Sequence, residues 1–272
     1  MLPGVFKAKK KNGEIYYRSS ITYLNKHISL GSYKTEEEAH ETYMLAKDIL
    51  NNTDKWNIDN YPASCLLSFH KWVVLINVRD NGIYFRNPIY LKPRYFLYYI
   101  DADTALKLDI DDLFYYAKYK ISKRGGHLYT SEYGMQVNFL SRYGIKNYAI
   151  SGRDYIFING DHMDFRYSNI EIVNRYYGVA KFLKNDKAFY QAKINVNGDY
   201  IIGRYNSEEE AAIAYNKASD ILKDKGFKKN YPKNYIEGID EITYAAIYQR
   251  LRISKKLREI IVWNIPNILT IF

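Results

Sequence analysis

One stretch of this sequence occurs twice, in distant parts of the chain. YRSSITYLNKHISLGSYKTEEEAHETYMLAKDIL covers residues 17–50, and YQAKINVNGDYIIGRYNSEEEAAIAYNKASDIL covers residues 190–222. Each copy follows a Gly-Val pair, and each is followed by Asn-Tyr-Pro. A repeat with this many shared landmarks indicates a duplicated structural unit. The fold is therefore expected to contain one small module twice.

Each copy changes its hydrophobic period part-way along. Residues 17–23 alternate between two faces, which is typical of a β-strand. Thr35-x-x-Glu38 and Ser207-x-x-Glu210 then fit a capping box, and apolar residues follow at helical spacing. The pattern predicts an α+β fold in which each module is a three-stranded antiparallel sheet backed by one helix.

The positive charge of the chain is concentrated on the predicted sheets. The formal net charge is +10. Residues 1–34 hold seven Lys or Arg and one acid, whereas residues 35–62 hold two basic residues and seven acids. Residues 175–206 hold six basic residues and two acids, and residues 207–232 hold five of each. Basic sheets with acidic or neutral helices favour a phosphate-bearing partner that faces the sheets.

The two modules resemble a known family. Gly-Val, the sheet pattern, LGSYKTEEEAHETY and the closing NYP are similar to the apetala-type, or ethylene-response-factor, DNA-binding domain, over roughly residues 3–62 and 176–232. In that family the sheet lies in the major groove of DNA and its outward side chains contact bases and phosphates. The resemblance implies double-stranded DNA as a partner and two DNA-binding domains, at residues 1–62 and 175–232.

Carried over by position, the resemblance identifies outward residues in both copies. In the first copy they are Phe6, Ala8, Arg18, Ser20, Thr22, His27 and Ser29. In the second copy they are Ala180, Phe182, Gln191, Lys193, Asn195, Asp199 and Ile201. The candidate DNA-binding residues among and around them are Lys7, Lys9, Lys10, Lys11, Arg18, Ser20, Thr22, His27, Gln191, Lys193 and Asn195. Arg, Gln, Lys and Asn can read base edges, and the lysines can contact phosphates.

The segment 63–174 between the copies is rich in Tyr, Phe and Ile. Its apolar runs predict strands at 72–78 and 95–100, and residues 101–120 have a helical pattern. INGDHMDFRYSNIEIVN, residues 158–174, resembles the core of HNH homing endonucleases, whose members often carry an apetala-type domain directly downstream. The resemblance spans about residues 95–174 and implies a ββα nuclease core.

The chemistry of that family needs a histidine base and a metal-binding aspartate just before the I-N-G-D block. Ile156 and Phe157 occupy those places, and neither can take a proton or bind a cation. The HNH-like core is therefore predicted to be degenerate, with no catalytic residue and no cofactor. His162 is the alternative, as a turn histidine that could act with Mg²⁺ if the chain is an active nuclease. Turn and capping roles account for the retained polar residues, which are Asn159, Gly160, Asp161, Asp164, Arg166 and Asn169.

Other features narrow the class of protein. The single cysteine, Cys65, excludes an internal disulfide framework and a multi-cysteine zinc site. No apolar run is long enough for a transmembrane helix, and the N-terminus has no secretory pattern, so we expect no membrane partner and a cytoplasmic location in a host cell. Residues 124–126, Arg-Gly-Gly, fit a phosphate-binding turn or a plain hairpin equally well.

The C-terminal segment 233–272 is predicted to be a helical extension. Residues 238–262 combine apolar positions with a basic end, and Pro266 should stop any helix there. Such a helix either packs on the second module or makes a contact between two copies of the chain. The apolar tail 263–272 favours the homodimer alternative.

Three functions are consistent with these observations. The first is a non-catalytic, double-stranded DNA-binding protein, a regulator of a phage or mobile element, with two sheet-type modules on a dead nuclease core. The second is an active HNH homing endonuclease. The third is a phage-encoded inhibitor that binds a host nuclease or nucleoprotein, which the 30 tyrosines favour because tyrosine is enriched at protein interfaces.

Overall fold

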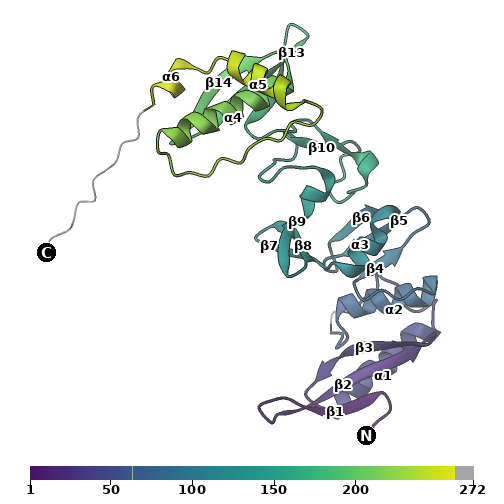
Figure 1. Ribbon diagram of the computed structural model, residues 1–272. Coiled ribbons are helices and arrows are strands. Elements are labelled where there is room, and N and C mark those ends of the chain that lie inside the picture. The colour runs from purple at the N-terminus through teal and green to yellow at the C-terminus, as the bar shows by residue number, and fades with distance from the viewer. Residues whose placement is uncertain (63, 261–272) are drawn as a thin grey trace, which may run out of the picture. The chain divides into compact units, whose positions relative to one another are not determined.

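The computed structural model describes residues 1–62 and 64–260 (Figure 1). They contain helices and small antiparallel sheets in succession, which confirms the α+β class. The chain forms two compact units. Within the described residues, the first comprises 1–139 and Phe157–Ile170, and the second comprises Leu140–Ile156 and 171–260.

The first module is a three-stranded antiparallel sheet with one helix packed against it. The strands β1 (Val5–Lys9), β2 (Ile15–Tyr23) and β3 (Lys26–Tyr33) pair in chain order, and α1 (Glu36–Asn51) follows. Val5 is paired with Ser19, and an extra residue in β3 makes a bulge at Ser19 and Ser20. Ile28, Ala46 and Ile49 are completely buried between the sheet and the helix.

The second module has the same topology and the same bulge. The strands β12 (Val179–Lys184), β13 (Lys187–Asn195) and β14 (Asp199–Tyr205) pair in chain order, and α4 (Glu208–Asp224) packs on one face (Figure 1). Val179 is paired with Ala192, and the register shifts between Ala192 and Lys193. The predicted architecture is therefore observed in both copies, and their registers align them residue by residue.

The helices begin where the capping pattern predicts. The Glu38 N–H donates to Thr35 Oγ1 (3.2 Å), and the Thr35 N–H donates back to the Glu38 carboxylate (3.4 Å), which completes the capping box. In the second copy the Glu210 N–H donates to Ser207 Oγ (3.1 Å). The Glu210 carboxylate instead accepts a hydrogen bond from Arg250 (2.7 Å), so this cap is coupled to a later helix.

A glycine at the start of each sheet holds the helix at close range. Gly4 has φ +76° and Gly178 has φ +68°, a left-handed conformation that glycine adopts without strain. A Cβ at Gly4 would lie 2.1 Å from the Tyr43 ring, and one at Gly178 would lie 2.3 Å from the Tyr215 ring. Each tyrosine thus occupies space that only glycine leaves open, which explains why both residues recur in the repeat.

The prediction of a strand at residues 72–78 is wrong, because these residues lie inside the helix α2 (Phe69–Asn81). The seven residues from Trp72 to Val78 are all buried. A helix covered on several sides has no polar stripe, so its sequence has the same continuous apolar run as a buried strand. Gly82, with φ +71°, ends the helix.

The prediction of a helix over residues 101–120 is correct only in its last part. Residues Ala105–Asp109 form β6, whose buried Leu106 and Leu108 alternate with more exposed neighbours. β6 pairs with β5 (Tyr95–Tyr99), which in turn pairs with β4 (Ile89–Leu91), so strand pairing prevails over the helical pattern. A 3₁₀ turn (Ile110–Asp112) and the short helix α3 (Leu113–Lys118) follow.

The rest of the middle segment is built from short strands. β7 (Ile121–Arg124), β8 (His127–Glu132) and β9 (Met135–Asn138) form one sheet, and a 3₁₀ helix (Phe139–Tyr143) follows. β10 (Tyr155–Phe157) and β11 (Ile170–Ile172) form a two-stranded sheet, with a 3₁₀ turn (Tyr167–Asn169) before β11. No helix lies between β11 and β12, so the expected ββα core consists of a β-hairpin without its helix.

The predicted single helix over residues 238–262 is also wrong within the described residues. α5 (Glu241–Arg250) is followed by an extended segment and then by α6 (Lys255–Arg258). The Lys217 ammonium donates to the carbonyls of Tyr248 (2.7 Å) and Leu251 (2.9 Å), which stabilises the end of α5. The Ser254 N–H then donates to the Ile202 carbonyl (2.9 Å) at the outer edge of β14.

The C-terminal segment therefore packs on its own module. Leu251, Ile253 and Leu257 are buried in the core of the second module, as the packing alternative predicts. The homodimer alternative depends on the tail 263–272, which lies outside the described residues. None of the helices in residues 1–62 and 64–260 has the length and apolar character needed to cross a lipid bilayer.

Gly178→Ala is expected to destabilise the second module by about 2–4 kcal/mol, because it combines backbone strain with steric overlap against the Lys193 carbonyl oxygen and the Tyr215 ring. Gly226→Ala is the matched control, since Gly226 has φ +87° but a Cβ there would meet nothing within 4 Å. Its expected cost is about 1 kcal/mol from the backbone alone. Thermal unfolding followed by circular dichroism measures both losses, and equal losses would contradict the proposed glycine–tyrosine fit.

Candidate nucleic-acid interface

The sheet of each module, β1–β3 or β12–β14, has one face covered by its helix and one face that the described residues leave open, here called the helix-free face. On the first sheet, Phe6, Arg18 and Ser32 lie side by side across the three strands. Thr22 pairs with His27 nearer the β2–β3 turn, and both are exposed. The structure thus brings Arg18, Thr22 and His27 onto one open surface, as predicted.

The other five candidates in the first copy contribute little to this open surface. Ser20 is only 8% exposed, because its short side chain lies in the middle strand at the bulge. Lys7 and Lys9 alternate with Phe6 and Ala8, so they share the face of the buried Val5, on the helix side. Lys10 and Lys11 follow β1, and Lys10 pairs with Glu14 (2.9 Å). Arg18 is therefore the one cationic strand residue on this helix-free face.

The helix-free face of the second sheet is more basic and more aromatic. Gln191 lies between Ala180 and Arg204, and Lys193 pairs with Ile201. Lys193 and Arg204 are exposed, and within the described residues neither forms an ion pair. Lys184 and Lys187 form the pair next to the β12–β13 turn and add two more exposed cations.

An aromatic pair occupies the middle of this second face. Phe182 and Phe189 are cross-strand partners whose rings stack with 5.8 Å between their centroids. The Arg204 guanidinium lies 5.6 Å from the Phe182 ring centroid, within the range of a cation–π contact. Asn195, one of the predicted candidates, is held by Asp199 (2.9 Å) and by the Lys229 ammonium (2.7 Å). The Asn195 amide is therefore held by hydrogen bonds within the protein, whereas Gln191 and Lys193 can contact a ligand.

The sequence pattern missed Lys184, Lys187 and Arg204, and for Arg204 the reason is the bulge. Counting every second residue from Asp199 through Ile201 leads to Gly203 and Tyr205, which would leave Arg204 on the helix side. The bulge inserts Ile202 as an extra residue, so the alternation reverses and Arg204 joins the helix-free face. Gly203 inside a strand was the available signal, because glycine in a strand often marks a bulge.

Residues 158–169, here called the block 158–169, form a loop built around one buried carboxylate. Asp164 is completely buried, and the Arg166 guanidinium donates to both of its oxygens (2.8 and 2.7 Å). Asn159 donates to the same carboxylate (3.0 Å), and the Lys107 ammonium lies 3.4 Å away. Burial alone would raise the pKa of Asp164, but the hydrogen bonds from Arg166 and Asn159 and the charge of Lys107 lower it to about 2.

The other retained polar residues close the same loop. Asn169 donates to the Asp164 carbonyl (2.8 Å) and accepts from the Asn159 N–H (2.8 Å). The Asp161 N–H donates to the Asn159 side chain (2.8 Å) where Gly160 adopts φ +78°. These contacts are the turn and capping roles that the sequence predicted for the block, so its polar groups are used to hold the loop in shape.

The residues beside this loop pack into a small apolar cluster. Phe157 is 9% exposed and packs edge-on against Phe165, with ring centroids 5.2 Å apart, and Ile156 is half-buried beside it in β10. His162 is exposed, and its ring lies edge-on to Phe157 at 5.2 Å. No cluster of three His, Cys, Asp or Glu residues with metal-binding geometry occurs in the described part of the chain.

Two further sequence candidates have plain structural roles. Gly125 and Gly126 both have positive φ (56° and 81°), and Arg124 pairs with His127 across them, so this segment is a tight two-residue hairpin turn. Cys65 is a free, half-buried thiol, and burial raises its pKa, which lowers its reactivity.

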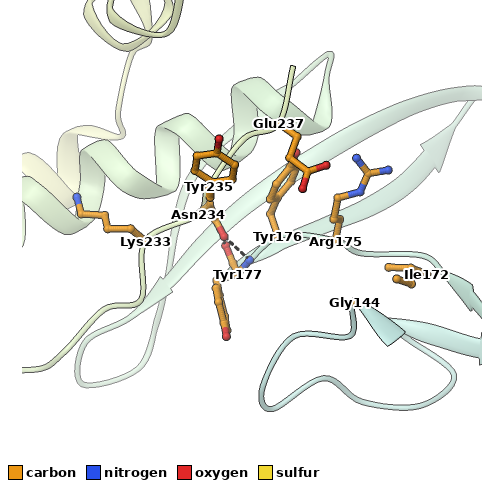
Figure 2. A pocket seen from close by; sticks show the side chains of 9 residues that line it. All are labelled: Gly144, Ile172, Arg175, Tyr176, Tyr177, Lys233, Asn234, Tyr235 and Glu237. Carbon is orange, nitrogen blue, oxygen red and sulfur yellow. Dashed lines mark hydrogen bonds between the residues drawn. The ribbon is translucent and has the colours of Figure 1, made fainter. Parts of the chain in front are cut away.

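The second unit also contains a hollow of about 510 Å³ (Figure 2). Its wall comprises Gly144, Ile172, Arg175, Tyr176, Tyr177, Lys233, Asn234, Tyr235 and Glu237. Asn234 accepts a hydrogen bond from the Tyr177 N–H (2.7 Å) and donates to the Tyr177 carbonyl (3.1 Å). The Lys233 ammonium is paired with Asp220. The hollow therefore lies where Tyr177 and Asn234 are hydrogen-bonded to each other. None of the residues that line it belongs to a helix-free face.

Comparison of the chain with protein-family models, with curated proteins and with solved structures yields no match. The interface is consequently defined by its own geometry.

Asp164→Asn is expected to destabilise the fold by about 1–2 kcal/mol at pH 7, a figure kept low because Arg166 and Lys107 are partly exposed. The folded-state pKa is lowered, so the ionised carboxylate stabilises the fold above the unfolded value of about 3.9, and this stabilisation is lost as the pH falls towards 2. Urea unfolding of both proteins at pH 7 and pH 2.5 should show a difference in the free energy of unfolding that is much smaller at pH 2.5.

The control for this measurement is Asp161→Asn, because Asp161 is an exposed carboxylate in the same loop. It should be nearly neutral at both pH values. A gap between the natural protein and Asp164→Asn that stays constant from pH 7 to pH 2.5 would contradict the role assigned to the ionised Asp164.

Proposed function

We propose that this chain binds double-stranded DNA through the helix-free faces of its two sheets and does not cleave it. The observation that carries this proposal is the second helix-free face. There Lys184, Lys187, Lys193 and Arg204 form no ion pair within the described residues and surround an aromatic pair. Such a surface has the cations that phosphates require and side chains that can reach base edges.

The dimensions of the module fit the major groove. Adjacent strands lie about 4.8 Å apart, so three strands span about 10 Å, and the groove is about 12 Å wide. Arg204, Lys193 and Gln191 lie on neighbouring strands of one face. Arg and Lys pair with guanine edges, and Gln pairs with adenine, so these three residues supply base contacts while Lys184 and Lys187 contact phosphates.

The biological context of this proposal comes from the resemblance described above. Apetala-type domains beside an HNH-like core favour a phage or mobile-element regulator that acts inside a host cell. The block 158–169 supports the non-catalytic part of the proposal, because its Asp164 is completely buried and accepts hydrogen bonds from Arg166 and Asn159 within the loop.

Binding to a random-sequence duplex is expected to weaken roughly 100-fold between 50 and 200 mM salt if about four phosphates are neutralised. Lys193→Ala and Arg204→Ala should each weaken binding at fixed salt, and Arg18→Ala should do so less. Fluorescence anisotropy with a labelled duplex measures these affinities.

Two lysines on the helices provide matched controls. Lys47 in α1 and Lys223 in α4 are exposed, and neither lies on a helix-free face. Lys47→Ala and Lys223→Ala should leave affinity unchanged. Binding that is independent of salt, or equal losses in the helix and sheet variants, would overturn the proposal.

Supercoiled plasmid incubated with the protein and Mg²⁺ or Mn²⁺ is expected to remain supercoiled. Agarose gel electrophoresis distinguishes nicked from intact plasmid. Metal-dependent nicking that disappears in His162→Ala would reverse the non-catalytic assignment and support the homing-endonuclease alternative.

A protein partner is the second candidate function, and one observation favours it. Several large side chains outside the sheets are more than 80% exposed, namely Phe114, Tyr133, Tyr148, Tyr235 and Ile242. Exposed aromatic residues are typical anchors of protein interfaces. Affinity capture from host lysate, with and without nuclease treatment, separates the two candidates, because a nuclease-resistant partner would support a host nuclease or nucleoprotein as the target.

A further inference from the structure

The two modules of this chain can be compared position by position, because their registers and bulges coincide. Val5 and Val179 pair with Ser19 and Ala192, and the bulge follows that pair in both sheets. On the helix side, equivalent positions are closely similar. The identical pairs include Val5 and Val179, Tyr17 and Tyr190, Ile21 and Ile194, Gly31 and Gly203, Tyr33 and Tyr205, Ala39 and Ala211, and Tyr43 and Tyr215.

The helix-free faces differ at every equivalent strand position of the predicted interface. They also differ at the position that the bulge adds to each face, which is Ser32 in the first sheet and Arg204 in the second. The pairs are Phe6 and Ala180, Ala8 and Phe182, Arg18 and Gln191, Ser20 and Lys193, Thr22 and Asn195, His27 and Asp199, Ser29 and Ile201, and Ser32 and Arg204. The duplication has thus kept the core that builds the module and changed the surface that would meet a ligand.

The arginine of the helix-free face lies on a different strand in each sheet. In the first sheet Arg18 is on the middle strand and Ser32 lies beside it on the third. In the second sheet Gln191 is on the middle strand and Arg204 lies beside it on the third. Neighbouring strands are about 4.8 Å apart, whereas successive base pairs of DNA are about 3.4 Å apart. Two modules docked in the same way would therefore present Arg to different base pairs.

Cationic charge is also divided unequally between the faces. The second face has Lys184, Lys187, Lys193 and Arg204. The first face has Arg18, and its Lys10, at the position equivalent to Lys184, is paired with Glu14 (2.9 Å) where the second copy has Lys187. Lys193 is exposed at a position where the first sheet has the nearly buried Ser20. Phosphate contacts supply much of the affinity for DNA, so the second sheet should contribute the larger share.

We propose that the DNA target of this chain consists of two unlike half-sites, and that the half read by the second sheet supplies most of the affinity. This inference rests on the proposed DNA-binding function. Two identical modules would select a repeated half-site, since identical side chains read identical bases. Here Gln191, Lys193 and Arg204 select a half-site centred on adenine and guanine contacts, and Arg18 selects a different one.

Selection of the full-length protein against a pool of random duplexes tests the inference. The expected result is an enriched sequence with two dissimilar parts. Arg204→Ser should lower affinity for that duplex by about tenfold and relax selection in one part only, while Arg18→Gln should relax the other part with a smaller loss.

An exchange variant keeps composition and net charge constant. Arg18→Gln combined with Gln191→Arg swaps equivalent residues between the copies, and circular dichroism confirms that it folds. The enriched sequence should then change in both parts at once. An enriched sequence made of two equal halves, or one that the exchange leaves unaltered, would overturn the inference alone. A pool with no enriched sequence that also shows no salt-dependent binding would overturn the proposed function as well.

Discussion

The contact between a left-handed glycine and a tyrosine ring determines the geometry of both modules. Gly4 and Gly178 leave room for Tyr43 and Tyr215, so each helix lies directly against the start of its sheet. This contact assigns one face of each module's sheet to the helix and leaves the other face open. Whatever the sheets bind must meet that open face, so the candidate interface depends on two glycines that carry no chemistry of their own.

The bulge in each sheet then decides which side chains share the open face. An extra residue, Leu30 in the first sheet and Ile202 in the second, reverses the alternation in the last strand. Ser32 and Arg204 thereby lie beside Arg18 and Gln191. Because the two bulges are equivalent, the two faces differ in which residues occupy the same positions. The two copies can therefore be compared directly within one chain.

In the middle segment, the polar residues of the block 158–169 have structural roles. Asp164 binds Arg166, Asn159 and Lys107 in the loop. The sequence was sufficient to predict these turn contacts, because Asn, Asp and Gly at such spacing favour turns. It misidentified the helix α2 as a strand, because a fully buried run has no periodicity that separates helix from strand.

The sequence by itself determined the repeated module, its α+β class, and the start of each helix, because capping residues, alternation and the apolar stripe act over a few neighbouring positions. Only the tertiary structure decided which basic residues share a face. Lys7 and Lys9 lie on the helix side and Arg204 lies on the open side, since the bulge and the docked helix define the faces. The end of α5 at Arg250 is likewise stabilised by Lys217, distant in sequence, which binds the carbonyls of Tyr248 and Leu251.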